Sequence, residues 1–166
     1  MARFTLPRDL YHGKGSIEVL KTLKGKKAMV CVGGGSMRRF GFLDRIEAYL
    51  KEAGMEVAFI EGIEPDPSVE TVMKGAKIGI EAHVNFVIGI GGGSPMDAAK
   101  AIALMIANPE DNESLLYESR PAPHLPVVAV PTTAGTGSEV TPWAVITRHS
   151  ERTKRTPLRC PFYFAQ

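Results

Sequence analysis

Features that would mark several protein classes are scarce in this sequence. It holds 2 cysteines, Cys31 and Cys160, which lie far apart and outside any C-x-x-C pattern. This spacing argues against a disulfide framework and favours a reducing compartment. No apolar stretch near the N-terminus is long enough for a signal peptide or a membrane span. We therefore expect a cytoplasmic protein without a membrane partner.

An excess of charge of one sign is also absent. The 20 basic and 18 acidic residues give a net charge of +2, which is not the basic footprint of a protein that binds nucleic acid. The 4 histidines, His12, His83, His124 and His149, are scattered without the spacing of metal ligands. We therefore expect neither a nucleic-acid partner nor a metal site in this chain.

Glycine and proline, by contrast, are plentiful and clustered, with 17 and 12 residues. Two copies of Gly-Gly-Gly-Ser stand at 33–36 and 91–94, and a polar, threonine-rich loop runs over 131–139. Hydrophobic residues make up 44% of the 166 residues, which is enough for one domain with its own core.

Short apolar runs alternate with helical patterns along the chain. The runs predict buried strands at 27–32, 56–60, 86–90 and 127–130, and 143–147 is a candidate for a fifth. Each of the first four runs is short and rich in branched apolar side chains, as strands covered on both faces are.

Apolar residues at helical spacing predict a helix over 37–53, which Gly54 stops. A second helix is expected to begin with Asp66 as its N-cap and Pro67 at its first position. The segment 95–107 is apolar nearly all round, which predicts a deeply buried helix.

This alternation is typical of an α/β fold, a Rossmann-like parallel sheet with helices on both faces. Ligands of such sheets bind at the carboxyl ends of the strands. The two glycine-rich turns and the threonine-rich loop each follow directly on a predicted strand. We therefore expect all three to converge on one edge of the sheet.

The turn at 91–94 has the features of an anion site. Three glycines let the backbone approach an anion closely. Ser94 is predicted to cap the following helix, with Pro95 at its first position and Asp97 three residues after the cap. Backbone N–H groups at such a helix start, aided by the helix dipole, bind phosphate. The alternative is a tight strand-to-helix turn that binds nothing. The motif is neither a P-loop nor the spaced G-x-G-x-x-G fingerprint.

The loop at 131–139 offers the hydroxyl groups of Thr132, Thr133, Thr136 and Ser138. Hydroxyls at this density suit contacts with ribose and phosphate. Threonines in a loop are also ordinary turn formers, so the loop alone leaves both interpretations open.

In this order and spacing, the runs GGGSPMDAAK at 91–100 and PTTAGTGSEVTP at 131–142 resemble the iron-containing (group III) alcohol dehydrogenases. The opening run FTLPRDLYHGKGSIEVL at 4–20, the first GGGS and EPDPS at 64–68 extend the resemblance over nearly the whole chain. Glycerol dehydrogenases and dehydroquinate synthases share the architecture, but the chain resembles them less in the second run.

The resemblance implies that residues 1–166 form the nicotinamide-dinucleotide-binding domain of such an enzyme, with 148–166 as an uncertain tail. In the family, one aspartate and three histidines of a C-terminal, all-helical domain bind iron or another divalent metal. The chain ends at Gln166, before any such positions, so we expect it to be truncated relative to the family and to lack both metal ligands and catalytic residues.

The resemblance also implies roles for individual residues. The cofactor pyrophosphate would lie on the second glycine turn, the phosphates and ribose on the threonine loop, and the nicotinamide near the end of the chain. The residues at the matching positions are Gly92, Gly93 and Ser94 with Asp97 just behind them, then Thr132, Thr133 and Thr136, then Asp66 near the adenosine, and Val145 and Lys154 on the nicotinamide side.

One departure from the family pattern concerns the choice of cofactor. Relatives that prefer NAD place an aspartate after the first strand, where it binds the ribose hydroxyls, but this chain has Gly33 there. A carboxylate would repel a 2′-phosphate, whereas Gly33, Gly34, Gly35 and Ser36 could cradle one through N–H and hydroxyl groups. Arg38 or Arg39 could add positive charge. We therefore expect NADP to be preferred over NAD. The alternative is an open turn with two solvated arginines.

The resemblance implies alcohol dehydrogenase activity for an intact enzyme, with hydride passing between a small alcohol or aldehyde and the nicotinamide ring. The fragment alone is expected to be inactive. The alternatives are a non-catalytic stand-alone nucleotide-binding module, or part of an enzyme similar to glycerol dehydrogenase or dehydroquinate synthase. An apolar face left exposed by truncation would favour a homo-oligomer.

Overall fold

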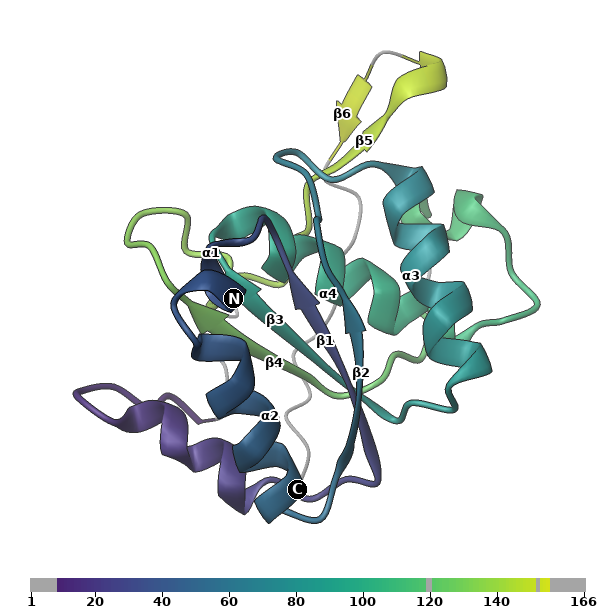
Figure 1. Ribbon diagram of the computed structural model, residues 1–166. Coiled ribbons are helices and arrows are strands. Elements are labelled where there is room, and N and C mark those ends of the chain that lie inside the picture. Colours follow the sequence, from purple (N-terminus) through teal and green to yellow (C-terminus); the bar gives the residue numbers. More distant parts are fainter. Residues whose placement is uncertain (1–8, 119–120, 152, 156–166) are drawn as a thin grey trace, which may run out of the picture.

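The structure, a computed structural model, describes residues 9–118, 121–151 and 153–155. At its centre lies a 4-stranded parallel sheet with the order β2-β1-β3-β4 (Figure 1). The strands confirm the sequence prediction to within one residue at their ends. They are β1 (Lys27–Val32), β2 (Glu56–Ile60), β3 (Phe86–Gly91) and β4 (Val127–Pro131).

Both faces of the sheet are covered, as the apolar strands predict. Because side chains alternate along a strand, Met29 and Cys31 of β1 belong to one buried cluster, and Val30 and Val32 to another. The first cluster lies against α3 (Val69–Glu81) and α4 (Gly93–Ala107). The second lies against the 3₁₀ helix η1 (Ser16–Thr22) and α2 (Phe42–Glu52). The expected Rossmann-like α/β class is confirmed.

Helix α4 is the most deeply buried element, with every residue from Pro95 to Ile106 buried. Small residues set its distance from its neighbours. A Cβ atom placed on Gly89 of β3 would lie 2.8 Å from the Cα of Met96, and one on Gly75 of α3 would lie 2.5 Å from Cδ1 of Ile102. The lack of a side chain at Gly89 lets β3 approach the backbone of α4 this closely, and the side chain of Ile102 fills the space that a Cβ on Gly75 would take.

The predicted helix over 37–53 is in fact two helices. A short α1 (Ser36–Arg39) precedes α2. The helical conformation is interrupted between them at Gly41, which has φ 70. Because this left-handed conformation cannot continue a helix, apolar spacing alone overestimated the length. The predicted stop is confirmed, since Gly54 has φ 77 directly after the C-cap of α2.

Two predicted helix caps are wrong. The N-cap of α3 is Ser68, whose hydroxyl accepts from the amide of Thr71, whereas Asp66 lies outside the helix with φ 56. The N-cap of α4 is Gly92, so Ser94 already lies inside the first turn. From there its Oγ accepts a 3.2 Å hydrogen bond from the amide of Asp66 instead of capping its own helix.

The candidate fifth strand does not join the main sheet. β5 (Ile146–Arg148) pairs in antiparallel fashion with β6 (Thr153–Arg155), and this hairpin projects from the domain (Figure 1). The connection between α4 and β4 contains the short helix η2 (Glu113–Tyr117), and η3 (His149–Glu151) follows β5. Among the described residues, no helix combines the length and hydropathy needed to cross a membrane.

Candidate functional site

The three loops expected to share one edge of the sheet do so (Figure 1). The amide of Thr132 donates a 2.8 Å hydrogen bond to the carbonyl of Gly91. A Cβ on Gly93 would lie 3.1 Å from Oγ of Ser138, and a Cβ on Gly33 would lie 3.5 Å from Cγ of Pro95. Segments far apart in the sequence therefore form one surface at the carboxyl ends of β1, β3 and β4.

The glycine turn after β3 depends on its lack of side chains. Gly91 has φ 142, and a Cβ there would lie 2.9 Å from Cγ of Pro95. The first backbone N–H groups of α4, which is 15 residues long, have no carbonyl partner within the helix. Together with the helix dipole they make this turn chemically suited to an anion.

The segment before α3 is tied to this turn and to β5 by its backbone. Besides the amide that reaches Ser94, the carbonyl of Asp66 accepts from Oγ1 of Thr147 at 3.1 Å. The amide of Thr147 in turn donates to the carbonyl of Pro67 at 2.9 Å. Asp66 is exposed beside the glycine turn as a result.

A carboxylate that the sequence analysis did not single out stabilises the same segment. Glu64 accepts hydrogen bonds from the amide and hydroxyl of Ser68 and from the hydroxyl of Thr71. Burial alone would raise the pKa of Glu64, but these donors together lower it to about 2. Its signal in the sequence was a glutamate four and seven residues before two hydroxyl side chains at a helix start.

The turn after β1 lies open to solvent. Gly34, Gly35 and Ser36 are exposed, while Gly33 is half-buried and its carbonyl accepts from the amide of Gly62 at 2.9 Å. Nearby, the guanidinium of Arg38 pairs with the carboxylate of Glu61. Their hydrogen bonding lowers the pKa of Glu61 and raises that of Arg38. Arg38 is therefore ion-paired, while its side chain stays 54% exposed.

The threonine loop presents its hydroxyl-bearing residues unequally. Thr132, Thr133 and Thr136 are exposed, whereas Ser138 is buried against the glycine turn. The amide of Ser138 donates to Oγ1 of Thr136 at 3.4 Å. The three threonines named as candidate ligand contacts are thus accessible from solvent at the shared edge.

The remaining candidates are Asp97 in α4, Val145 directly before β5, and Lys154 in β6. Asp97 is buried, and its carboxylate accepts from the amide of Val145 and lies beside Lys100, a buried lysine that the sequence analysis did not single out. Val145 is itself 36% exposed. Lys154 lies in β6 opposite Thr147, and the structure describes its backbone alone.

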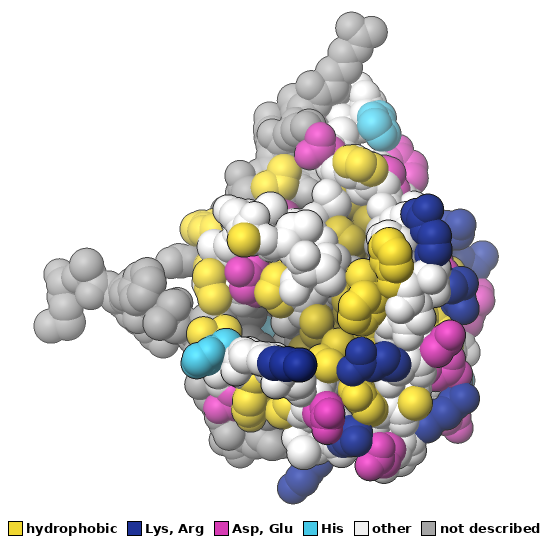
Figure 2. All heavy atoms as spheres, turned by 60° about the vertical axis from the view of Figure 1, so that its left-hand side comes forward, with side chains coloured by type: hydrophobic (Ala, Val, Ile, Leu, Met, Phe, Trp, Pro, Cys, Tyr) yellow, Lys and Arg dark blue, Asp and Glu magenta, His cyan; other side chains and the backbone are white. Residues whose placement is uncertain are grey.

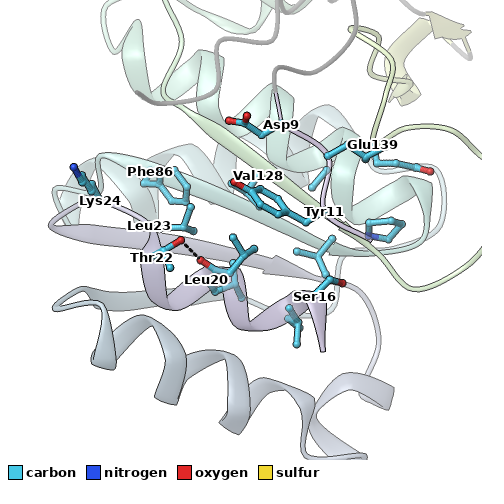
Figure 3. A pocket seen from close by; sticks show the side chains of 16 residues that line it. Asp9, Tyr11, Ser16, Leu20, Thr22, Leu23, Lys24, Phe86, Val128 and Glu139 are labelled. Atoms are coloured by element: carbon cyan, nitrogen blue, oxygen red, sulfur yellow. Dashed lines mark hydrogen bonds between the residues drawn. The ribbon is translucent and has the colours of Figure 1, made fainter. Parts of the chain in front are cut away.

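A cavity of about 410 Å³ lies between η1 and β4 and reaches Pro131 and Glu139, the two ends of the threonine loop (Figure 3). Tyr11, Leu20 and Val128 line it, and Glu139 contributes from the loop after β4. None of the residues 91–94 lines it. The cavity is largely apolar in its lining residues and does not have the chemistry of a phosphate site.

Several large hydrophobic side chains are exposed, among them Leu10, Tyr11, Phe40 and Trp143. Figure 2 shows hydrophobic side chains gathered near the middle of one face, with basic and acidic ones around them. The expected homo-oligomer stays a prediction. Among residues 9–118, 121–151 and 153–155, no three histidine, cysteine or acidic side chains come together as a metal site.

The architecture and the loops point to a family, and the comparison with known families decides which one. The model for iron-containing alcohol dehydrogenases matches residues 7–166. The chain belongs to this family. The resemblance inferred from the motifs is thereby confirmed.

Curated members of the iron-containing alcohol dehydrogenase family show how far the likeness extends. The NADPH-dependent butanol dehydrogenase of Clostridium saccharobutylicum is 52% identical over 158 residues, which are 93% of this chain and 41% of that protein. The NADH-dependent butanol dehydrogenase B of Clostridium acetobutylicum is 40% identical over 149 residues, 86% of this chain and 38% of that protein.

Among solved structures, an iron-containing alcohol dehydrogenase from Thermotoga maritima superposes with a TM-score of 0.82 at 37% identity, covering 98% of this chain and 45% of that one. The chain therefore spans less than half the length of these members of the family.

Proposed function

We propose that this chain binds NADP(H) across the carboxyl edge of its sheet, as the cofactor-binding part of a metal-dependent alcohol dehydrogenase. The observation that carries the proposal is the contact between the glycine turn after β3 and the threonine loop after β4, joined by the bond from Thr132 to Gly91. A turn rich in amide groups and a loop rich in hydroxyls on one surface suit a pyrophosphate and its riboses.

In this proposal, the pyrophosphate lies on the amide groups of Gly92, Gly93 and Ser94. The exposed hydroxyls of Thr132, Thr133 and Thr136 bind phosphate and ribose oxygens. Asp66 lies at the adenosine end, and Val145 and Lys154 lie at the nicotinamide end. The packing around the glycine turn supports this arrangement, because a Cβ on Gly91 would meet Pro95 and a Cβ on Gly93 would meet Ser138.

The preference for the 2′-phosphate rests on the turn at 33–36. No carboxylate follows β1, and the exposed Gly34, Gly35 and Ser36 leave room for a phosphate group. The 52%-identical relative is named as NADPH-dependent, while the 40%-identical one is named as NADH-dependent. Arg38 could add charge once it separates from Glu61.

The chemistry that we propose for this chain is confined to holding the cofactor. Its described residues hold no cluster of metal ligands, so no step that needs a metal is assigned to them. In a protein of the relatives' length, hydride would pass between a small alcohol or aldehyde and the nicotinamide ring, whose position these loops would set.

Isothermal titration calorimetry of the purified chain with NADP⁺ and with NAD⁺ tests the proposal. We expect weak binding of NADP⁺ and about tenfold weaker binding of NAD⁺, the effect of roughly one charge-assisted hydrogen bond. No turnover of butan-1-ol with NADP⁺ is expected. Absence of binding to either cofactor would refute cofactor binding, and tighter binding of NAD⁺ would refute the 2′-phosphate preference. Robust alcohol oxidation by this chain would refute the proposal that it only holds the cofactor.

A further inference from the structure

The first turns of α4 contain a buried ion pair that the proposed cofactor contacts do not explain. The Nζ atom of Lys100 lies 3.3 Å from Oδ1 of Asp97, and the two residues are 0% and 7% exposed. Removing two charges from water costs free energy that their attraction offsets only when further hydrogen bonds are made. The other hydrogen bonds of Asp97 and Lys100 therefore indicate the structural role of the pair.

Both members of the pair bind the backbone of one short segment. Lys100 Nζ donates a 2.6 Å hydrogen bond to the carbonyl of Trp143, and Oδ2 of Asp97 accepts a 2.9 Å hydrogen bond from the amide of Val145. In extended backbone, the carbonyl of one residue and the amide of the second residue after it point to the same side. The pair thus makes the two backbone hydrogen bonds to segment 143–145 that a neighbouring strand would make.

This attachment decides which side chains the segment presents. Ala144 is 0% exposed, whereas Trp143 and Val145 are 43% and 36% exposed. The segment follows directly on the threonine loop, and its far end is held by the hydrogen bond from Thr147 to Pro67. Between these points, Asp97 and Lys100 anchor it to the same helix that begins at the glycine turn.

We propose that Asp97 and Lys100 are positioning residues that clamp segment 143–145 to α4 and so present Trp143 and Val145 to the nicotinamide end of the bound cofactor. This inference rests on the proposed nucleotide binding and gives a positioning role to Asp97, which the resemblance placed just behind the glycine turn. The carboxylate acts through the backbone of Val145 and does not touch the cofactor.

The sequence offers a direct probe, because Trp143 is its 1 tryptophan. Lys100→Met removes the charge and the donor while keeping an unbranched side chain that is one atom shorter. We expect acrylamide to quench Trp143 roughly twofold more efficiently in this variant, since the freed segment opens locally, with the far-ultraviolet circular dichroism unchanged. The control is Lys77→Met, which removes an exposed lysine 4.0 Å from Glu81 on α3 and should leave the quenching unchanged.

Two variants of Asp97 test the same clamp from its other side and cover the case in which Lys100→Met does not fold. Asp97→Ala removes the acceptor for the amide of Val145 and should increase the quenching. Asp97→Asn keeps an acceptor oxygen and should restore most of the protection. Wild-type quenching in Asp97→Ala, or in a folded Lys100→Met, would overturn the clamp.

Calorimetry with two ligands separates positioning from a merely structural role. Lys100→Met should weaken binding of NADP⁺ about tenfold while 2′-phospho-ADP-ribose, which lacks the nicotinamide, stays within about twofold of wild type. Equal losses for both ligands would overturn the positioning role. If the wild-type chain binds neither ligand, the proposed function fails and the cofactor half of this inference fails with it, but the quenching of Trp143 still decides whether the clamp exists.

Discussion

The amide of Thr132 donates a 2.8 Å hydrogen bond to the carbonyl of Gly91. Gly91 is the last residue of β3, and Thr132 is the first residue after β4. The hydrogen bonding between these parallel strands therefore continues one step beyond β4. This continued pairing holds the glycine turn and the threonine loop side by side at the carboxyl edge of the sheet.

The fit between these two loops should be sensitive to the size of residue 93. A Cβ on Gly93 would lie 3.1 Å from both Ser138 Oγ and Thr136 Cγ2. We expect Gly93→Val to push the threonine loop away and weaken NADP⁺ binding about tenfold, and Gly93→Ala to have a smaller effect in the same direction, because overpacking grows with volume. Calorimetry measures the NADP⁺ affinity of both variants. Wild-type affinity in the valine variant would contradict the proposal that the glycine turn and the threonine loop bind the cofactor together.

The cofactor preference should reverse when a carboxylate follows β1. A Cβ on Gly33 would lie 3.4 Å from the carbonyl oxygen of Ile63 and 3.5 Å from Pro95 Cγ, so a side chain fits there at ordinary contact distances. Gly33→Asp should weaken NADP⁺ binding about tenfold by repelling the 2′-phosphate, and should strengthen NAD⁺ binding. Gly33→Asn, of equal size and without charge, is the control. Equal effects of the two substitutions would exclude the electrostatic explanation.

Stability should fall in acid partly through Glu64. Its pKa is about 2 in the folded chain, below the ordinary 4.5. The unfolded state therefore binds the proton more tightly, and the contribution of the carboxylate is complete above pH 4.5 and lost as the pH falls towards 2. Glu64→Gln should cost about 1 kcal/mol at pH 7, a low value because the group is only partly buried, and should flatten this acid loss.

Urea unfolding between pH 7 and about pH 2.5 measures both effects of the Glu64 substitution. Glu70→Gln is the matched control, because Glu70 is exposed in the first turn of the same helix. It should keep the wild-type slope of stability against pH. A wild-type slope in Glu64→Gln would show that the hydrogen bonds from Ser68 and Thr71 do not favour the ionised form.

The thiol of Cys31 should be inert in the folded chain. It is 0% exposed in β1, and burial raises its pKa far above the ordinary value. In a Cys160→Ser background, which removes the other thiol, we expect Ellman's reagent at pH 8 to react only as fast as the chain unfolds. Reaction within seconds under native conditions would contradict the packing of β1 against α3 and α4.

The close approach of β3 to α4 should make position 89 intolerant of any side chain. A Cβ on Gly89 would lie 2.8 Å from both Met96 Cα and Ala99 Cβ, so Gly89→Ala should destabilise the chain by about 3 kcal/mol. Gly35→Ala is the control, because nothing lies within 4 Å of that Cβ and φ is −66. It should change stability by less than about 0.5 kcal/mol. Equal midpoints of thermal unfolding for the two variants would contradict the prediction.

Local patterns were sufficient for much of the fold. The apolar runs located β1 to β4, and the apolar character all round segment 95–107 predicted the burial of α4. These features are encoded by the neighbours of each residue along the chain, because burial on both faces needs apolar side chains at nearly every position. The motifs after β3 and β4 could likewise be recognised in the sequence. The parallel topology implied that they lie together at the carboxyl edge of the sheet.

Other features depend on contacts that no local pattern contains. Ser94 resembles a helix cap, yet its hydroxyl meets the amide of Asp66 from another turn. Lys100 is a charged residue within an apolar helical pattern, and nothing near it in the sequence indicates a partner. The carbonyl that it binds belongs to Trp143, which lies far along the chain.

The sequence by itself thus determined the layers of this domain, the edge where its loops gather and its family. Tertiary structure alone decided which polar group meets which, because a buried hydrogen bond is specified by position in space and not by distance along the chain.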